Sequence, residues 1–244
     1  MKEIFRTVVG SRLYNLHSET SDTDVKCLAL PDAGDLLGLS DTARAHWDGG
    51  PDDPPDTVIY SVAKFFTLLA KGNPTLVELL FVPDDAILLD RMEAREIRNF
   101  CRKTFITKTL IPSYMGYVRD QFKRVVERKA QNNRTTALEK FGFDTKSASH
   151  VYRLAVQATE LMSSGKCSPR MTGGDREIAL AIKRGDYNYD RTVDTLKLAI
   201  RGMEVAESVC KLPEKPDMAS ADEYIKTLHW HVVNAEYGSC LTSA

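Results

Sequence analysis

The hydrophobic pattern of the first 90 residues predicts short strands separated by short helices and loops. Apolar runs of strand length cover Ile4–Val9 and Val25–Leu30. Ser61–Lys71 instead repeats its apolar side chains at helical spacing and stops at Gly72, a residue type that commonly ends helices. Pro31–Pro55 is dominated by Asp, Gly and Pro and is expected to be a loop. We therefore expect a small sheet with flanking helices in this part of the chain.

From about residue 90 the pattern changes to amphipathic helices. Ile111–Gln131 and Val193–Val209 carry apolar side chains at helical spacing, and Ala221–Asn234 is a final amphipathic helix. The change predicts an α+β protein: a small mixed β-sheet core in residues 1–90, followed by an all-helical domain in residues 91–244.

Composition and charge narrow the class of protein. The 244 residues include 33 Lys and Arg against 34 Asp and Glu, so no overall basic field favours non-specific nucleic-acid binding. A nucleic-acid partner would need a local basic patch such as Lys123–Lys129, which is most simply the solvated face of a helix. The five cysteines are widely spaced and lack a Cys-x-x-Cys pair, which argues against a disulfide framework or a zinc site. Without a secretory signal or an apolar run of membrane-spanning length, we expect a soluble cytoplasmic protein.

The clearest candidate chemistry lies between the two predicted strands. Gly10 and Ser11 follow the first strand, and Asp22 and Asp24 lead into the second. Alternate residues of an extended strand project from one face, so the two carboxylates should lie close together. Mg²⁺ held by one or two carboxylates and substrate phosphates would relieve their repulsion, while the Gly-Ser turn can offer N–H groups and a hydroxyl to phosphate oxygens. Each motif alone is common in ordinary turns, but together they predict metal-assisted phosphoryl chemistry.

A second candidate group lies in the helical half. If Asp144 or Thr145 caps a helix, then Lys146, His150 and Arg153 stand at i, i+4 and i+7 on one face. Such a stripe suits a triphosphate or a phosphate backbone. From spacing alone, an ordinary basic surface with a histidine at the edge of the core is the simpler interpretation.

A further acidic residue stands out in an apolar part of the sequence. Glu78 interrupts an apolar run bounded by prolines, and a carboxylate there is costly to bury unless it is paired or binds a cation. A short amphipathic helix with Glu78 facing solvent explains the same pattern. Asp56 is another acidic residue beside apolar positions, at the start of the strand-like segment Asp56–Tyr60.

These motifs resemble a known superfamily. Gly10-Ser11 with Asp22-x-Asp24 is similar to the signature of the DNA polymerase β-type nucleotidyltransferases. Further motifs resemble its predicted nucleotidyltransferase branch of bacteria and phages, of the RNA-ligase-associated type. They are Asn73-Pro74…Glu78-Leu79-Leu80, Gly142-x-Asp144-x-Lys146-x-Ala148-x-His150-x-x-Arg153-Leu154, Glu160-Leu161-Met162-x-x-Gly165 and Ile182-Lys183-Arg184-Gly185.

The resemblance implies roles for the candidate residues. Asp22, Asp24 and a third carboxylate would hold two Mg²⁺ or Mn²⁺ ions. Glu78 is preferred over Asp56, because superfamily members carry this carboxylate on a later strand and a predicted helix separates Glu78 from the Asp-x-Asp strand. The nucleotide would be bound by residues from both halves, with the helical domain closing over the cleft: Gly10, Ser11, Lys146, His150 and Arg153.

The implied reaction is transfer of a nucleoside monophosphate from an NTP to an acceptor hydroxyl with release of pyrophosphate. The acceptor is open: an RNA end, including a tRNA end, a protein or a small molecule. A non-catalytic nucleotide- or RNA-binding module and a metal-dependent phosphodiesterase are the alternatives. Two positions depart from the wider superfamily. Asn15 lies near the position where superfamily members often have a second glycine, and Asn can adopt the tight backbone conformation of that glycine. Lys26 lies where a small residue is frequent in the superfamily.

Overall fold

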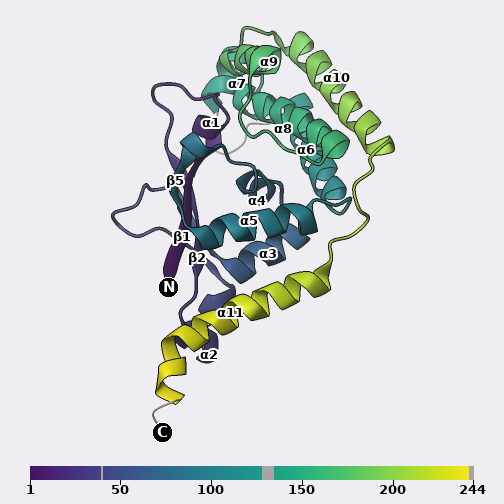
Figure 1. Ribbon diagram of the computed structural model, residues 1–244. Coiled ribbons are helices and arrows are strands. Elements are labelled where there is room, and N and C mark those ends of the chain that lie inside the picture. The colour runs from purple at the N-terminus through teal and green to yellow at the C-terminus, as the bar shows by residue number, and fades with distance from the viewer. Residues whose placement is uncertain (40, 128–134, 242–244) are drawn as a thin grey trace.

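A mixed β-sheet forms the centre of the N-terminal part of the molecule. The computed structural model describes residues 1–39, 41–127 and 135–241. Within these ranges, five strands form one sheet in the order β3-β4-β2-β1-β5 (Figure 1). The strand bounds are Lys2–Val9 for β1, Asp24–Leu30 for β2, His46–Asp48 for β3, Thr57–Ser61 for β4 and Ile87–Asp90 for β5.

Strand pairing brings the end of β1 and the starts of β2 and β4 to one edge. β1 runs antiparallel to β2, with Val9 opposite Asp24, and antiparallel to β5. β4 runs parallel to β2, with Thr57 beside Val25, and antiparallel to β3. Residues that directly precede β2 and β4 in the chain therefore meet at the same edge.

The two faces of the sheet have different coverings. Phe5 of β1 and Leu28 of β2 lie on one face and belong to the same hydrophobic core as Phe65 of α3. On the opposite face, Arg6 binds Asp53 of the β3–β4 connection at 2.7 Å. The helices thus pack on the face that also carries Asp24, since Asp24 and Leu28 are four residues apart in one strand.

The other described residues form mostly helices and their connections, which confirms the predicted α+β class. The α-helices in the described ranges are α1 (Gly10–Leu13), α2 (Ala33–Leu37), α3 (Val62–Ala70), α4 (Pro74–Leu79), α5 (Met92–Phe105), α6 (Leu110–Val126), α7 (Thr135–Phe141), α8 (Thr145–Ser164), α9 (Gly173–Arg184), α10 (Tyr189–Ser208) and α11 (Met218–Leu241). Short 3₁₀ turns cover Asp41–Arg44 and Asp84–Ala86. No helix among the described residues is both long enough and apolar enough to cross a membrane.

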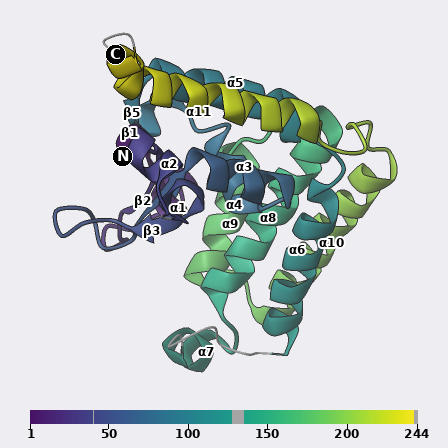
Figure 2. The same ribbon diagram turned by 90° about the horizontal axis from the view of Figure 1, so that it is seen from below.

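Helix α8 is the centre of the helical part, packing against α6, α9 and α10. The last helix, α11, returns to the N-terminal part and runs beside α5, α3 and α2 (Figures 1 and 2). Phe66 of α3, Phe100 of α5 and Tyr224 of α11 form an aromatic stack, with Phe100 and Tyr224 centroids 4.2 Å apart. The sheet region and the end of the chain therefore share one packed unit.

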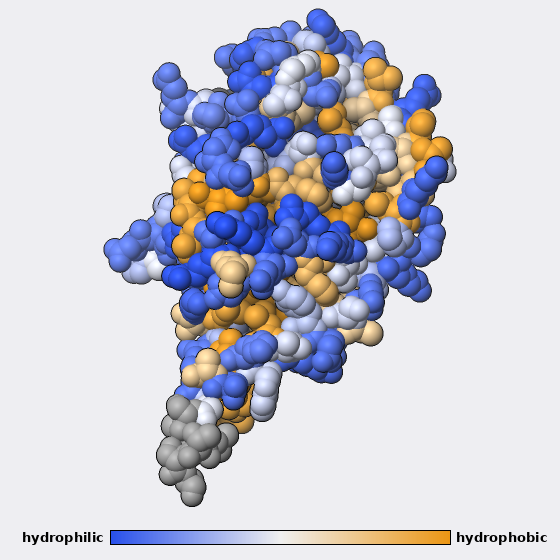
Figure 3. Space-filling model, in the orientation of Figure 1, coloured by the Kyte–Doolittle hydropathy of each residue, from blue (hydrophilic) through white to orange (hydrophobic). Residues whose placement is uncertain are grey.

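One face of the molecule is mostly polar. Figure 3 shows hydrophilic residues over much of one face, interrupted by smaller hydrophobic bands. The candidate basic patch Lys123–Lys129 is described only as far as Glu127, where Lys123 pairs with Glu127 and Arg124 with Asp120. Residues 128 and 129 lie outside the described part of the chain.

The expectation of a strand around Glu78 is wrong. Residues Pro74–Leu79 form helix α4. The Asn73 side chain accepts a hydrogen bond from the Thr75 amide at 3.0 Å, and Pro74 occupies the first turn, where proline needs no amide donor. The Asn73 cap and Pro74 therefore favour a helix, whereas the apolar run alone was compatible with either a strand or a helix.

Candidate active site

Seven of the predicted site residues line one cleft between the edge of the sheet and helix α8. The cleft has a volume of about 570 Å³. Its walls include Gly10, Ser11, Asp22, Asp24, Lys146, His150 and Arg153. Asp56 and Glu78, the two candidates for a third carboxylate, are not among the residues that line it.

Gly10 and Asp24 are in direct contact at the floor of the cleft. Gly10 has φ of +66°, a conformation that other residues rarely adopt. A Cβ atom added to Gly10 would lie 1.8 Å from Oδ2 of Asp24. Glycine is therefore required here for two reasons: any other residue would be strained at this φ, and its side chain would collide with the carboxylate of Asp24.

The connection that carries Asp22 is held by backbone contacts. Arg12 donates from Nη2 to the carbonyl of Ser21 at 2.7 Å and from Nε to that of Asp22 at 3.3 Å. Asn15 has φ of +60°, which confirms the tight backbone expected there. Arg176 of α9 donates to the Asn15 carbonyl at 3.0 Å and so ties the start of this connection to the helical part.

Asp24 lies in a concentration of negative charge. Burial raises its pKa, and the neighbouring charges of Asp56 and Asp22 raise it further, while Lys146 opposes the shift. Asp56 directly precedes β4, and its carbonyl accepts a hydrogen bond from the Val25 amide at 3.3 Å, so its backbone lies beside the start of β2. The charges of Lys146 and Lys26 therefore offset only part of the effect on Asp24.

A hard divalent cation fits this edge of the sheet. Within residues 1–39, 41–127 and 135–241, no three His, Cys, Asp or Glu side chains gather closely enough to hold a metal ion by themselves. Mg²⁺ does not need such a cage, because it is usually bound by one or two carboxylates with water and substrate phosphates. Asp22 and Asp24, both open to the cleft, provide that partial set.

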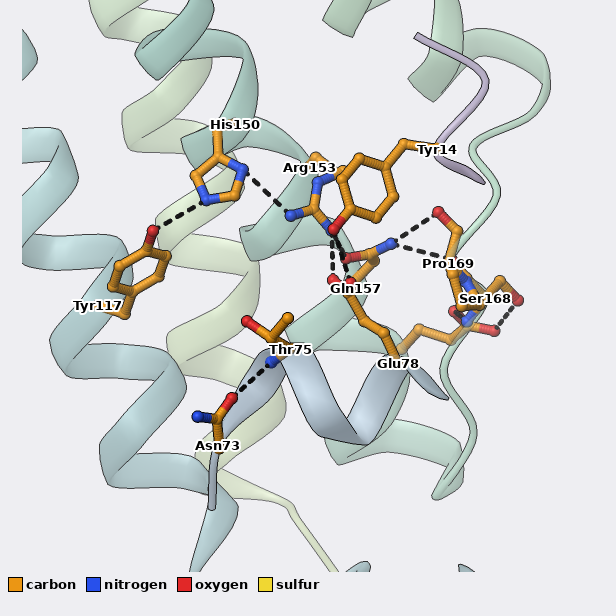
Figure 4. Close-up of polar contacts among 11 residues, drawn as sticks. Tyr14, Asn73, Thr75, Glu78, Tyr117, His150, Arg153, Gln157, Ser168 and Pro169 are labelled. Carbon is orange, nitrogen blue, oxygen red and sulfur yellow. Dashed lines mark hydrogen bonds and ion pairs between the residues drawn. The ribbon is translucent and has the colours of Figure 1, made fainter. Parts of the chain in front are cut away.

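Glu78 has a different environment from Asp24. It is 2% exposed, so the alternative of a solvent-facing side chain is excluded. Its Oε1 accepts from Nη1 of Arg153 at 2.5 Å, and its Oε2 accepts from the Tyr14 hydroxyl at 2.7 Å (Figure 4). The cation that accounts for this buried carboxylate is thus a guanidinium 75 residues further along the chain.

Arg153 is fixed from several sides. Its Nη1 also donates to Gln157 at 2.5 Å, and its guanidinium carbon lies 3.6 Å from the centroid of the Tyr14 ring. Gln157 in turn donates to the backbone carbonyls of Ser168 and Pro169 (Figure 4). Although Arg153 borders the cleft, it is 2% exposed, and Glu78 offsets its charge.

The predicted cap of α8 is confirmed and sets the direction of Lys146. Asp144 accepts from the Ser147 amide at 2.9 Å and from its hydroxyl at 2.8 Å. Lys146 follows in the first turn, exposed, and forms no ion pair with any residue in the described ranges. Its charge acts on Asp24 across the cleft.

Lys183 of α9 is a cleft residue to which the sequence assigned no role. Its Nζ donates to the Leu16 carbonyl, and burial together with the charge of Lys146 lowers its pKa. The sequence indicated this region through the motif Ile182-Lys183-Arg184-Gly185, but it could not show which of these side chains faces the cleft. Tyr14 and Tyr117 are further lining residues that the sequence did not single out.

Comparisons with known proteins agree with the motifs. Residues 1–223 match the family described as RlaP, RNA repair pathway DNA polymerase beta family. An uncharacterised 38.9 kDa protein of the nrdC–mobD intergenic region of Enterobacteria phage T4 is 30% identical over 130 residues. That alignment covers 50% of this chain and only 38% of the phage protein. No solved structure gives a significant match.

The family match extends over the sheet, the cleft residues of α8 and α9, and the start of α11. It confirms the resemblance drawn from the Gly-Ser and Asp-x-Asp motifs. The chain belongs to the RNA repair pathway DNA polymerase β family.

Proposed function

We propose that this protein is a Mg²⁺- or Mn²⁺-dependent nucleotidyltransferase that moves a nucleoside monophosphate from an NTP to a hydroxyl at an RNA end. Membership of the DNA polymerase β family indicates this reaction class and the use of divalent metals. The family description, which places it in RNA repair, supports RNA as the acceptor. The observation that carries the proposal is the contact of Gly10 with Asp24 in a cleft that also contains Lys146 and Lys183.

The phosphates of the NTP would lie between the Gly-Ser turn and the two lysines. Gly10 and Ser11 offer backbone N–H groups and a hydroxyl without an intervening side chain at Gly10. Partial burial, and then the charge of Lys146 across the same cleft, lowers the pKa of the half-buried Lys183, so the two lysines repel each other. A polyanion between them would turn that repulsion into attraction.

Asp22 and Asp24, which line the cleft, are our proposed metal-binding carboxylates, and Asp56, outside the cleft lining, is the proposed third carboxylate that supports them in place of Glu78. Asp56 acts directly on the pKa of Asp24 from the neighbouring strand, whereas Glu78 binds Arg153 and Tyr14. Bound Mg²⁺ would supply a lowered pKa for the attacking hydroxyl and neutralise charge on the leaving pyrophosphate.

The reaction itself is a single displacement. The acceptor oxygen forms a bond to the α-phosphorus, the bond from that phosphorus to the α,β-bridging oxygen breaks, and pyrophosphate leaves with the electron pair. The acceptor hydroxyl loses its proton to solvent water. The protein contributes mainly by holding acceptor and donor in line and by stabilising charge.

The carboxylate assignment is tested by single Asp→Asn changes at Asp22, Asp24 and Asp56. Each should reduce NTP-dependent pyrophosphate release on an RNA oligonucleotide by 100-fold or more, on the order expected for a lost electrostatic group in a catalytic site. Asp194→Asn, at an exposed position on α10, is the matched control and should be unaffected. Full activity of the Asp22→Asn/Asp24→Asn double variant would refute the proposal.

A further inference from the structure

The side chains that helix α8 contributes to the cleft change in charge along the helix. Lys146, in the first turn, acts electrostatically on both Asp24 and Lys183. His150 lies four residues later, about 6 Å along the helix axis, and faces Tyr117 of α6. The phosphate-binding charges are therefore near the start of α8, and an aromatic pair follows one turn further on.

Hydrogen bonding fixes the protonation of His150. Nη2 of Arg153 lies 3.1 Å from Nδ1 of His150 (Figure 4). A guanidinium only donates, so Nδ1 accepts and the imidazole carries its proton on Nε2. His150 is therefore neutral in this arrangement, whereas the family resemblance implied that it helps to bind the nucleotide phosphates.

The same logic orients the hydroxyl of Tyr117. Nε2 of His150 lies 3.2 Å from the Tyr117 oxygen and donates to it. The hydroxyl hydrogen of Tyr117 has no acceptor among the residues that the structure describes, and the side chain is 42% exposed at the cleft. Tyr117 thus presents a ring and one directed O–H donor to whatever occupies this end.

We infer that Tyr117, oriented by His150, binds the nucleoside part of the NTP, with its ring against the base and its hydroxyl donating to a base or ribose acceptor. The inference rests on the proposed function. A neutral aromatic pair suits a nucleobase, since every base has a face that can stack on an aromatic ring, whereas it offers little to a phosphate.

His150 and Arg153 are positioning residues in this account. The Glu78 carboxylate holds Arg153, Arg153 sets the tautomer of His150, and His150 directs the Tyr117 hydroxyl (Figure 4). This chain links a buried ion pair to the proposed nucleoside contact. It gives the motif residues His150 and Arg153 a role in which neither touches phosphate.

The test compares binding of α,β-methylene NTPs and of inorganic tripolyphosphate, both with Mg²⁺, to the wild type and to Tyr117 variants. Tyr117→Ala should weaken NTP-analogue binding about 25-fold, because a base–aromatic contact and a hydroxyl contact, each worth about fivefold, are both lost, and it should leave tripolyphosphate binding unchanged. Tyr117→Phe should weaken it about fivefold through loss of the hydroxyl alone. Tyr237→Ala, at a similarly exposed tyrosine on α11, is the control.

The outcomes separate this inference from the proposed function. Equal weakening of analogue and tripolyphosphate by Tyr117→Ala, or no weakening of either, would overturn the nucleoside assignment while leaving the nucleotidyltransferase proposal intact. A wild type that binds no NTP analogue would overturn both. Preserved analogue binding in His150→Phe together with preserved sensitivity to Tyr117→Phe would overturn the positioning role of His150.

Discussion

Replacing Glu78 by Gln should destabilise the fold rather than remove a metal ligand. The substitution keeps the shape of the side chain but leaves the guanidinium of Arg153 buried without its counter-charge, since the two side chains are 3% and 2% exposed. Removing one partner of a fully buried ion pair typically costs about 3–5 kcal/mol. For a chain of this length each kcal/mol lowers the melting temperature by roughly 2–4 °C, so a fall of roughly 6–20 °C is expected.

A double-mutant cycle isolates the pair from its surroundings. Arg153→Met alone should be similarly costly, because it leaves the Glu78 carboxylate buried and uncompensated. The double variant should lose much less free energy of unfolding than the two single changes combined. Urea unfolding followed by circular dichroism measures all four proteins.

Metal binding provides the decisive contrast. Mn²⁺ binding in the presence of an α,β-methylene NTP should be retained by folded Glu78→Gln and lost in Asp24→Asn. The reasoning is refuted if Glu78→Gln unfolds like the wild type but no longer binds Mn²⁺, since that combination is the behaviour of a metal ligand.

Three other perturbations test separate parts of the account. Gly10→Ala should displace the carboxylate of Asp24 and reduce pyrophosphate release about 100-fold, the scale of a 1 Å misplacement in an active site. Lys183→Met should raise the KM for NTP about 10-fold through loss of one charged phosphate contact. Burial, and then the charge of Arg44, lowers the pKa of His229 on α11, so the unfolded chain binds this proton more readily than the folded chain does. The free energy of unfolding should therefore be retained above about pH 6.5 and fall below it. His229→Gln should reduce this loss, as measured by urea unfolding.

Each of these changes has a matched control in the chain. Gly174 has open space around it, so Gly174→Ala should retain activity. Lys211 is exposed away from the cleft, and Lys211→Met should leave KM unchanged. His231 is exposed on the same helix as His229, and His231→Gln should keep the wild-type loss of stability at low pH. A control variant that changed the measured property as much as its test variant would contradict the corresponding argument.

Short-range features of the sequence were the most predictable. The Gly-Ser turn, the Asp-x-Asp pair and the cap at Asp144 each depend on neighbouring residues. The structure places the Gly-Ser and Asp-x-Asp residues in one cleft and confirms the cap. The α+β division followed from a change in hydrophobic period near residue 90. These features need no knowledge of how distant segments pair.

Contacts between residues far apart in the sequence could not be predicted. The sequence showed that burying Glu78 would be costly without a partner, but it could not show that Arg153 is that partner. It could not place Asp56 beside Asp24 either, because this depends on the parallel pairing of β2 with β4. The neutral state of His150 depends on which group faces Nδ1, and helical spacing is silent about that.

The position of the transferred label tests the central claim most directly. The protein is incubated with Mg²⁺, an RNA oligonucleotide with free terminal hydroxyls, and an NTP labelled at either the α- or the γ-phosphate. A nucleotidyltransferase puts the α-label into RNA and releases the γ-label as pyrophosphate, and Asp24→Asn abolishes both. Transfer of the γ-label to RNA, or RNA cleavage that needs no NTP, would contradict the account.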